Sequence, residues 1–338
     1  MKIFRNILIV SIILCSCVLF SVTVFSSDDS NEQVIIRLGH GSAESNDRHK
    51  AILHFKDLVE EKSNGSIEVL IYPNEQLGSE AAMIESLSFN NLQMVVASSF
   101  SQFDERISVF ELPYLFDSKE QAWSILDGEI GQEVAEPLLD YNIRILSYFE
   151  NGFRHITSDK PINEPADLRG LKIRTPEIPM FLQTFEALGA GPTPMAFGEL
   201  YMALQQGTVD AQENPLSTIY ASRFNEVQSH LILTSHQYMP LPAAISDEFW
   251  HSLTKEQQDI IESSAHEAAD FHRTLTDENE SVILNELKEA GMTIIEPDQE
   301  LFSEKVEVVY DNYRTIFGDA LIDSVLDAIQ NHEEELDD

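Results

Sequence analysis

A segment of more than thirty residues without glycine or proline constrains the fold of this chain most strongly. It runs from Thr254, a good N-cap, to Gly291, a good helix stop. Between them, apolar residues recur at helical intervals: Ile260, Ile261, Ala265, Ala268, Phe271, Leu275, Val282 and Leu287. One uninterrupted helix would be about 55 Å long, whereas a compact lobe is roughly 30 Å across. The segment therefore predicts a helix that spans two lobes; two shorter helices broken near Thr276 are the alternative.

Strand and helix patterns alternate along the rest of the chain. Residues 34–38 and 67–72 are β-rich, and a helical pattern after Ser45 and Asn46 separates them. A strand, a helix and a strand in this order imply a parallel pair with a right-handed crossover. Further strands are predicted at about 92–97, 143–146 and 171–174, and helices at about 79–90, 178–188 and 197–206. This alternation predicts an α/β fold.

The acidic composition and the placement of the cysteines narrow the possible functions of the chain. The 338 residues include 58 Asp+Glu against 21 Lys+Arg, a formal net charge of -37. Nucleic acid is disfavoured as a partner, because neutralising phosphates needs clustered basic residues. Such an acidic balance suits a saline or alkaline exterior. Both cysteines, Cys15 and Cys17, lie near the amino terminus, so the remaining chain has no disulfide and no cysteine nucleophile.

The amino terminus has the pattern of an export signal. Lys2 and Arg5 precede an apolar run from 7 to 25, and small and acidic residues follow, so residues 1–27 are predicted as a signal peptide. A single membrane anchor and lipidation at Cys17 are the alternatives. All three place the body outside the cytoplasm. At the other end, residues 331–338 are predicted as a solvated acidic tail.

Catalytic signatures are present only as near misses. His266 and Glu267 begin a zincin-like pattern, but Asp270 stands where the second histidine is required. No nucleophile elbow, Walker loop or complete dinucleotide fingerprint occurs. We therefore expect no enzyme activity, no cofactor and no metal.

The few basic residues indicate where an anion could bind. Arg174 lies at the carboxyl end of a predicted strand, where ligands of open α/β sheets gather, and a guanidinium can hold a carboxylate by two hydrogen bonds. A surface arginine paired with an acid is the alternative. Asn214 precedes Pro215, so we expect it in a loop with its amide free, or as a plain turn residue. Phe197 could flank a ligand or join the core.

Several motifs together resemble a known family. They are N-G-F-R at 151–154, L-R-G-L-K-I-R-T-P at 168–176, P-T-P-M-A-F at 192–197 and D-A-Q-E-N-P at 210–215, with L-G-H at 38–40 and Y-P at 72–73 nearer the amino terminus. In order and spacing, the chain resembles the extracytoplasmic solute-binding proteins of TRAP transporters, of the DctP type. The resemblance covers nearly all of the predicted mature chain.

The resemblance implies two α/β lobes that close on a ligand, a long helix spanning both, and a membrane permease as partner. It implies lobe I at 33–151 plus 240–279, lobe II at 152–239 plus 280–330, and a monomer. By the same resemblance, Arg174 clamps the ligand carboxylate, and Arg154, Asn214 and Phe197 lie beside the ligand.

Departures from the family bear on the ligand. Sialic-acid binders carry an asparagine and an acidic residue where this chain has Gly41 and Ser98, so sialic acid is disfavoured. Glu80 and Ser98 could contact ligand hydroxyls. We expect a small organic acid, first a C4-dicarboxylate and second a uronic acid. A ligand-sensing module for a membrane receptor is the alternative function, and a lyase acting on acidic sugars is a third.

Overall fold

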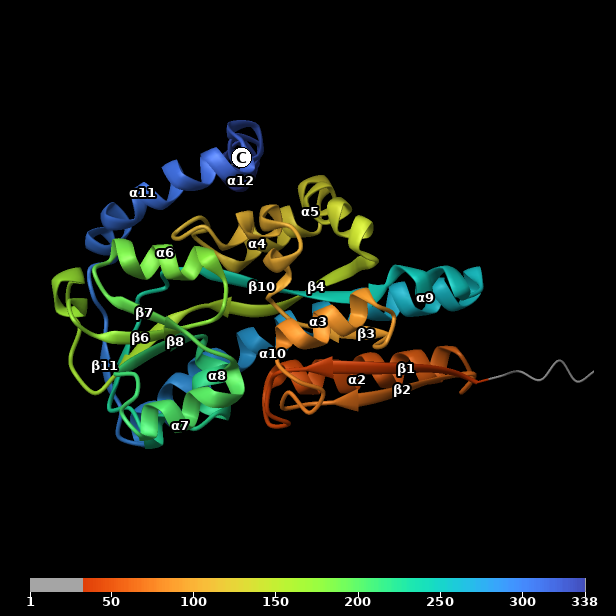
Figure 1. Cartoon of the computed structure of the whole chain (residues 1–338), viewed down its shortest axis with the longest axis horizontal. Coiled ribbons are helices and arrows are strands. Elements are labelled where there is room, and N and C mark those ends of the chain that lie inside the picture. The colour runs from red at the N-terminus through yellow and green to blue at the C-terminus, as the bar shows by residue number, and fades with distance from the viewer. Residues whose placement is uncertain (1–32, 338) are drawn as a thin grey trace, which may run out of the picture. The chain divides into compact units, whose positions relative to one another are not determined.

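Two β-sheets organise residues 33–337, the part of the chain that the computed structural model describes (Figure 1). The residues from Ile35 onward make up one unit that holds both sheets. The predicted signal peptide, with Cys15 and Cys17, lies outside the described residues. The first sheet has the order β2-β1-β3-β10-β4, with β1 (Val34–His40), β2 (Ile67–Tyr72), β3 (Met94–Val96), β4 (Ile143–Phe153) and β10 (Tyr238–Ser246).

The second sheet has six strands in the order β11-β9-β5-β8-β6-β7. Figure 1 shows β6, β7 and β8 on one side and β1, β2 and β3 on the other, with β4 and β10 between them. The parallel pairing of β1 with β3 and of β6 with β8 confirms the α/β prediction. The strands are β5 (His155–Ser158), β6 (Lys172–Thr175), β7 (Gly191–Pro194), β8 (Ala211–Asn214), β9 (His230–Ile232) and β11 (Thr293–Ile295).

Helices cover the sheets, and their ends follow local capping chemistry. The side chain of Asn46 accepts a hydrogen bond from the backbone N–H of Arg48 and so caps α2. The helices are α2 (Asp47–Lys62), α3 (Glu80–Ser88), α4 (Lys119–Leu126), α5 (Glu129–Ala135), α6 (Pro179–Ala187), α7 (Leu200–Gln205), α8 (Leu216–Ala221), α9 (Asp247–Ser252), α10 (Lys255–Glu289), α11 (Gln299–Phe317) and α12 (Asp319–Asp337). The 3-10 helices are η1 (Phe100–Gln102), η2 (Glu105–Glu111), η3 (Glu136–Tyr141), η4 (Pro165–Leu168), η5 (Phe197–Glu199) and η6 (Phe224–Glu226).

The long segment forms one helix, α10, of 35 residues. Thr254 and Gln257 form a capping box at its start, and no break occurs near Thr276. On the side of the first sheet, α10 packs against α2 and β4. Nearer its end, Ile283 and Leu287 join an apolar cluster with residues of α7 and α8. The helix therefore spans both halves of the fold, as the sequence predicted.

Besides α10, which leads from β10 to β11, two shorter segments connect the sheets. β4 of the first sheet is followed, after Arg154 alone, by β5 of the second. The return segment lies between β9 and β10, and the backbone N–H of Arg154 donates to the carbonyl of Gln237 in it. The register of β4 and β10 shifts between Met239 and Pro240, which leaves Asn151 as an extra residue on β4. Arg154 and Asn151 thus lie where the chain crosses between the sheets.

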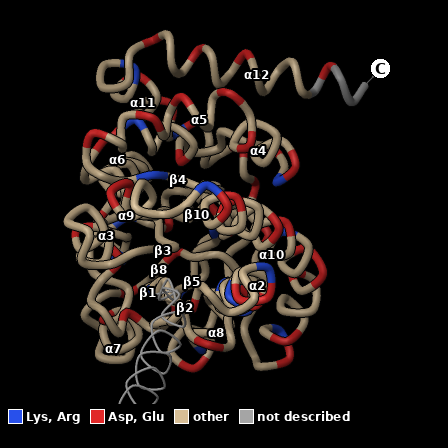
Figure 2. The backbone as a smooth tube through the Cα atoms, turned by 90° about the vertical axis from the view of Figure 1, so that its right-hand side faces the viewer, with Lys and Arg blue, Asp and Glu red and all other residues tan. Residues whose placement is uncertain are grey.

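The acidic end of the chain, predicted as a solvated tail, is helical. The helix α12 continues to Asp337 and therefore includes most of residues 331–338. Its apolar residues Ile322, Val325 and Ile329 are buried. In Figure 2, α12 carries acidic segments along its length.

Candidate functional site

One pocket brings together all six residues that the sequence singled out. Glu80, at the start of α3, and Ser98, just after β3, come from the side of the first sheet. The second sheet and the segments around it supply the other four: Arg154, Arg174, Phe197 and Asn214. These residues gather at or near strand ends, where open α/β sheets place ligands. Their roles toward a ligand stay predictions.

Arg174, unlike the pocket arginines Arg48 and Arg154, forms no ion pair with a carboxylate among the described residues. Its side chain is 3% exposed, and Nε and Nη2 both donate to the backbone oxygen of Met195, at 3.0 and 2.7 Å. Within residues 33–337, no hydrogen bond occupies Nη1. The guanidinium carbon lies 5.8 Å from the ring centroid of Phe197. Burial lowers the pKa of Arg174 to about 10, so the group still carries its charge at neutral pH.

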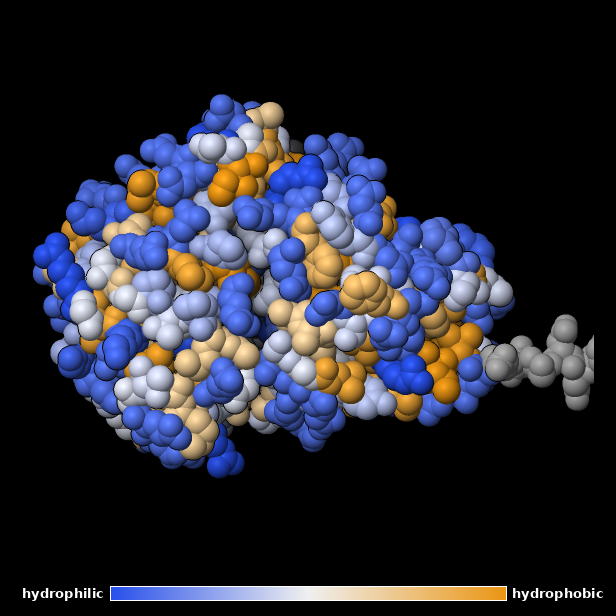
Figure 3. All heavy atoms as spheres, viewed as in Figure 1, coloured by the Kyte–Doolittle hydropathy of each residue, from blue (hydrophilic) through white to orange (hydrophobic). Residues whose placement is uncertain are grey.

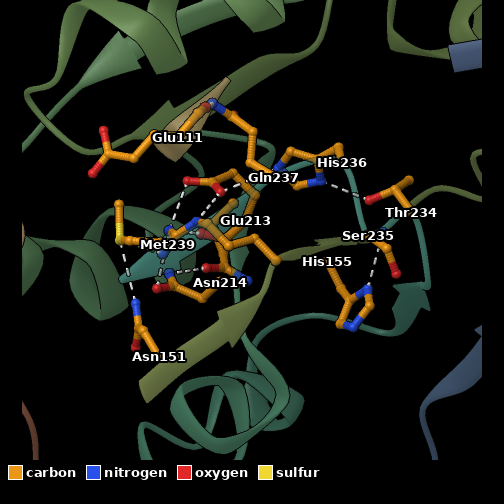
Figure 4. Close-up of polar contacts among 12 residues, drawn as sticks. Glu111, Asn151, His155, Glu213, Asn214, Thr234, Ser235, His236, Gln237 and Met239 are labelled. Carbon is orange, nitrogen blue, oxygen red and sulfur yellow. Dashed lines mark hydrogen bonds and ion pairs between the residues drawn. The ribbon is translucent and has the colours of Figure 1, made fainter. Parts of the chain in front are cut away.

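Arg154, by contrast, is held by a buried acid. Its side chain is 2% exposed, and Nε and Nη2 form a two-point ion pair with Glu213, which is fully buried. His236 adds a hydrogen bond between its Nε2 and the Glu213 carboxylate, at 3.3 Å, while its Nδ1 contacts Thr234 (Figure 4). Burial opposes ionisation of Glu213, but Arg154 and His236 together lower its pKa. The charge of Arg154 is therefore already neutralised within the protein.

Asn214 corrects one expectation. It is the last residue of β8 rather than part of a loop, and its side-chain nitrogen donates to Oε1 of Gln212 at 2.6 Å. Its side-chain oxygen accepts from Arg154 at 3.2 Å. The proline that follows does favour extended backbone, but a strand supplies it as well as a loop. One of the two amide hydrogens remains for a ligand.

A second ion pair lines the opposite wall. Nη1 of Arg48 donates to Oε1 of Glu80 at 2.7 Å, and the N–H and hydroxyl of Ser98 both donate to Oε2 at 2.9 Å. Burial raises the pKa of Glu80, but Arg48 and Ser98 outweigh it and lower the pKa. A Cβ at Gly41 would lie 2.8 Å from Oε1 of Glu80. Glycine at 41 therefore leaves the room that this carboxylate occupies.

The pocket residues that sequence reasoning missed include Arg48, Asn151 and Met239. One signal was available for Arg48, because a cation in the first turn of a helix opposes the helix dipole and needs another reason to be there. The side-chain nitrogen of Asn151 and Nη1 of Arg154 both donate to the sulfur of Met239, at 3.2 Å each. Figure 4 shows Asn151 and Met239 facing each other beside Asn214.

Phe197 lies between the pocket and the core, and its contact with a ligand stays a prediction. It lines the pocket and lies near Arg174, and its ring also meets Phe224 edge-on with centroids 6.2 Å apart. Phe224 is buried in the apolar cluster that includes Ile283 of α10. The aromatic ring therefore ties the pocket wall to the core.

No helix between residues 33 and 337 is long and apolar enough to cross a membrane. In the same range, no three His, Cys, Asp or Glu side chains are grouped so that they could hold a metal ion.

Two sheets joined by crossing strands and one spanning helix, with a charged pocket at the strand ends, define a two-lobed α/β binding protein. Residues 38–316 match the model of the bacterial extracellular solute-binding proteins, family 7 (DctP). The chain belongs to this family of TRAP solute-binding proteins, whose members are not enzymes. They bind small organic acids outside the cytoplasm and work with membrane permease subunits.

Three relatives illustrate the similarity. The 2,3-diketo-L-gulonate-binding periplasmic protein of Escherichia coli is 35% identical over 295 residues, 86% of each chain. The C4-dicarboxylate-binding periplasmic protein of Rhodobacter capsulatus is 32% identical over 78% of this chain and 80% of its own. The crystal structure of the sugar acid binding protein of Advenella mimigardefordensis in complex with galactonate has a TM-score of 0.86 at 33% identity, covering 89% of this chain and 99% of that one.

Proposed function

We propose that the organic acid captured by this protein is a hydroxylated monocarboxylate of the sugar-acid type, with its carboxylate on Arg174. The observation that carries the proposal is the pairing of charges in the pocket. Arg154 is paired with Glu213 and Arg48 with Glu80, so Arg174, bound to a backbone carbonyl, is the cation left for a ligand. One unpaired cation suits one carboxylate.

The remaining polar groups suit hydroxyls. Glu80 presents carboxylate oxygens, Ser98 a hydroxyl and Asn214 one amide hydrogen. A polyhydroxy chain can both donate to and accept from such groups, whereas a second carboxylate beside Glu80 would meet like charge. A C4-dicarboxylate, the first expectation from the sequence, therefore ranks below a sugar acid, and a uronic acid falls within the favoured class.

The ligands of relatives support the same order without fixing it. 2,3-Diketo-L-gulonate and galactonate, which two of the three relatives bind according to their names, are hydroxylated monocarboxylates. The third relative binds C4-dicarboxylates. Capture would proceed by closure, because contacts made by both lobes favour the closed state.

A thermal-shift screen tests the proposal. Galactonate, gluconate and glucuronate form one arm, succinate and malate the second, and neutral galactose the third. A ligand at 100 times its dissociation constant adds about 2.7 kcal/mol to the free energy of unfolding. We expect this shift in the first arm. A shift with the C4 acids alone, or with galactose alone, would contradict the proposal.

Three finer points belong to the same proposal. Lobe I is taken as 33–151 plus 240–279 and lobe II as 152–239 plus 280–330, because the strands of each sheet fall almost entirely within one set.

The protein acts as a monomer, which light scattering of the purified chain can test. Residues 1–27 are taken as a signal peptide, with lipid attachment at Cys17 as the alternative, and mass spectrometry of the mature amino terminus distinguishes the two.

A further inference from the structure

Glu75 reaches across the pocket from the first sheet's side to the second's. It lies in the turn after β2, lines the pocket and is half-buried. Its Oε2 accepts a hydrogen bond from the backbone N–H of Gly198, in η5, at 2.9 Å. Gly198 is exposed, so this contact lies at the outer end of the pocket.

The turn that carries Glu75 is fixed by several hydrogen bonds. The N–H groups of Asn74 and Glu75 donate to the carbonyls of Ser42 and His40, at 3.0 and 3.2 Å. Gly78 donates back to the carbonyl of Glu75 at 2.9 Å. Glu75 itself has a φ of 55°, in the left-handed region that a residue with a side chain seldom adopts. The position of the carboxylate is therefore determined by its own turn as well as by Gly198.

Gly198 leaves room for this carboxylate. A Cβ at residue 198 would lie 2.6 Å from Oε2 of Glu75. The φ of Gly198 lies outside the left-handed region, so an alanine there is free of backbone strain. The substitution Gly198→Ala would therefore displace the Glu75 carboxylate and leave its negative charge in place.

Charge near Glu75 is of mixed sign. Burial and the neighbouring Glu80 raise the pKa of Glu75 overall, although the Gly198 N–H and Arg174 act to lower it. Arg174 is the cation to which the ligand carboxylate is assigned above. A dicarboxylate bound to Arg174 by one carboxylate would bring its second carboxylate toward Glu75 and Glu80.

We propose that Glu75 is a specificity-determining residue, which holds a negative charge at the outer end of the pocket and rejects a ligand with a second carboxylate there. This inference rests on the proposed sugar-acid function and adds the residue that discriminates between monocarboxylates and dicarboxylates. The Glu75 oxygens accept from a terminal hydroxyl of a monocarboxylate, whereas a carboxylate at the same place meets like charge in a partly desolvated site.

Galactonate and galactarate form a matched pair of probes, because they differ only in whether the far carbon is a hydroxymethyl or a carboxylate. Calorimetry at pH 8 gives the ratio of their dissociation constants. We expect the wild-type protein to prefer galactonate, and Glu75→Gln to reduce that preference about tenfold or more, since like-charge contacts are costly. Glu85→Gln, at an exposed site on α3, controls for loss of one negative charge and should leave the ratio unchanged.

Gly198→Ala separates charge from position. It should reduce the preference too, but less than Glu75→Gln, because the carboxylate moves and stays charged. An unchanged ratio in Glu75→Gln overturns the proposed role of Glu75, and so does a wild-type protein that binds both probes equally. Neither result contradicts the binding of sugar acids. An unchanged ratio in Gly198→Ala overturns the positioning by Gly198. If the wild-type protein binds neither probe nor any hydroxylated monocarboxylate of the screen, the proposed function fails, and this inference with it.

Discussion

At the scale of single residues, the two arginines singled out by the sequence have different surroundings. Arg174 donates to a backbone carbonyl and keeps one nitrogen without a protein partner in the described residues, whereas Arg154 is paired with Glu213 at the crossing between the sheets. A neutral carbonyl leaves a guanidinium's charge available to a ligand, and a carboxylate does not. We therefore assign ligand binding chiefly to Arg174 and positioning to Arg154.

This assignment predicts separate effects of two substitutions. Arg174→Lys should weaken sugar-acid binding by roughly 2–5 kcal/mol, because an ammonium cannot reproduce the planar two-point contact. Arg154→Met should instead lower the free energy of unfolding by about 3–5 kcal/mol, since Glu213 is left buried without its partner. Calorimetry and urea unfolding measure the two effects, and Arg314→Lys on the surface of α11 is the control. Unchanged affinity in Arg174→Lys would refute the assignment.

At the scale of elements, β4 carries a buried acid close to the crossing. Glu150 is 1% exposed, and its Oε2 accepts from the indole of Trp123 and from the hydroxyl of Tyr238. Its Oε1 has no hydrogen-bonding partner in the described residues. Burial raises the pKa of Glu150 to about 7, although Trp123 and Tyr238, with Lys119 and Arg273 nearby, act to lower it.

The raised pKa predicts a pH dependence of stability. Because the folded state holds this proton to higher pH than the unfolded chain does, the contribution of Glu150 falls as pH rises from about 4.5 to above about 7. Glu150→Gln stays neutral and can still accept from Trp123 and Tyr238. The variant should therefore gain roughly 2–3 kcal/mol relative to wild type between pH 5 and pH 9 in chemical unfolding. A difference that stays constant over this range would contradict the role of burial.

The elements also show what a sequence can predict. The helix α10 follows from a long run without glycine or proline and a good cap at Thr254, which are local signals. The strand β10 gave no such signal, because Pro240 and Pro242 lie within it and proline normally argues against a central strand. Its place is set by pairing with β4, about ninety residues earlier, which local patterns do not contain.

The pocket, like the helices and strands, was predictable from the sequence only in part. The position of Arg174 at the end of a predicted strand indicated it, the family resemblance added Asn214, and the comparison with sialic-acid binders drew attention to Glu80; all three line the pocket. The sequence did not show which charged side chains of the pocket pair with each other. Only the fold shows that Glu213 neutralises Arg154 and that Arg48 neutralises Glu80, and these pairs change the favoured ligand from a dicarboxylate to a monocarboxylate.

At the scale of the whole molecule, acidic residues are spread over the surface while the charges of the pocket are largely paired. Figure 2 shows acidic positions along most helices and few basic ones, and Figure 3 shows hydrophilic side chains covering much of the visible face. With a net charge of -37 for the full sequence, surface repulsion opposes the folded state at low ionic strength. The local contacts of Arg174, rather than bulk charge, must therefore attract an anionic ligand.

This distribution predicts that salt affects stability but has little effect on binding. Sodium chloride from low to molar concentration should raise the melting temperature, because it screens repulsion between exposed carboxylates within a Debye length of about 10 Å at 0.1 M. The affinity for a sugar acid should change little, since Arg174 is buried and screened poorly. Differential scanning calorimetry measures the first quantity and titration calorimetry the second, with sucrose of equal osmolality as the control for solute exclusion. A melting temperature that falls steadily with salt would contradict both surface repulsion and adaptation to a saline exterior, and a gain with sucrose equal to that with salt would assign the effect to exclusion instead of screening.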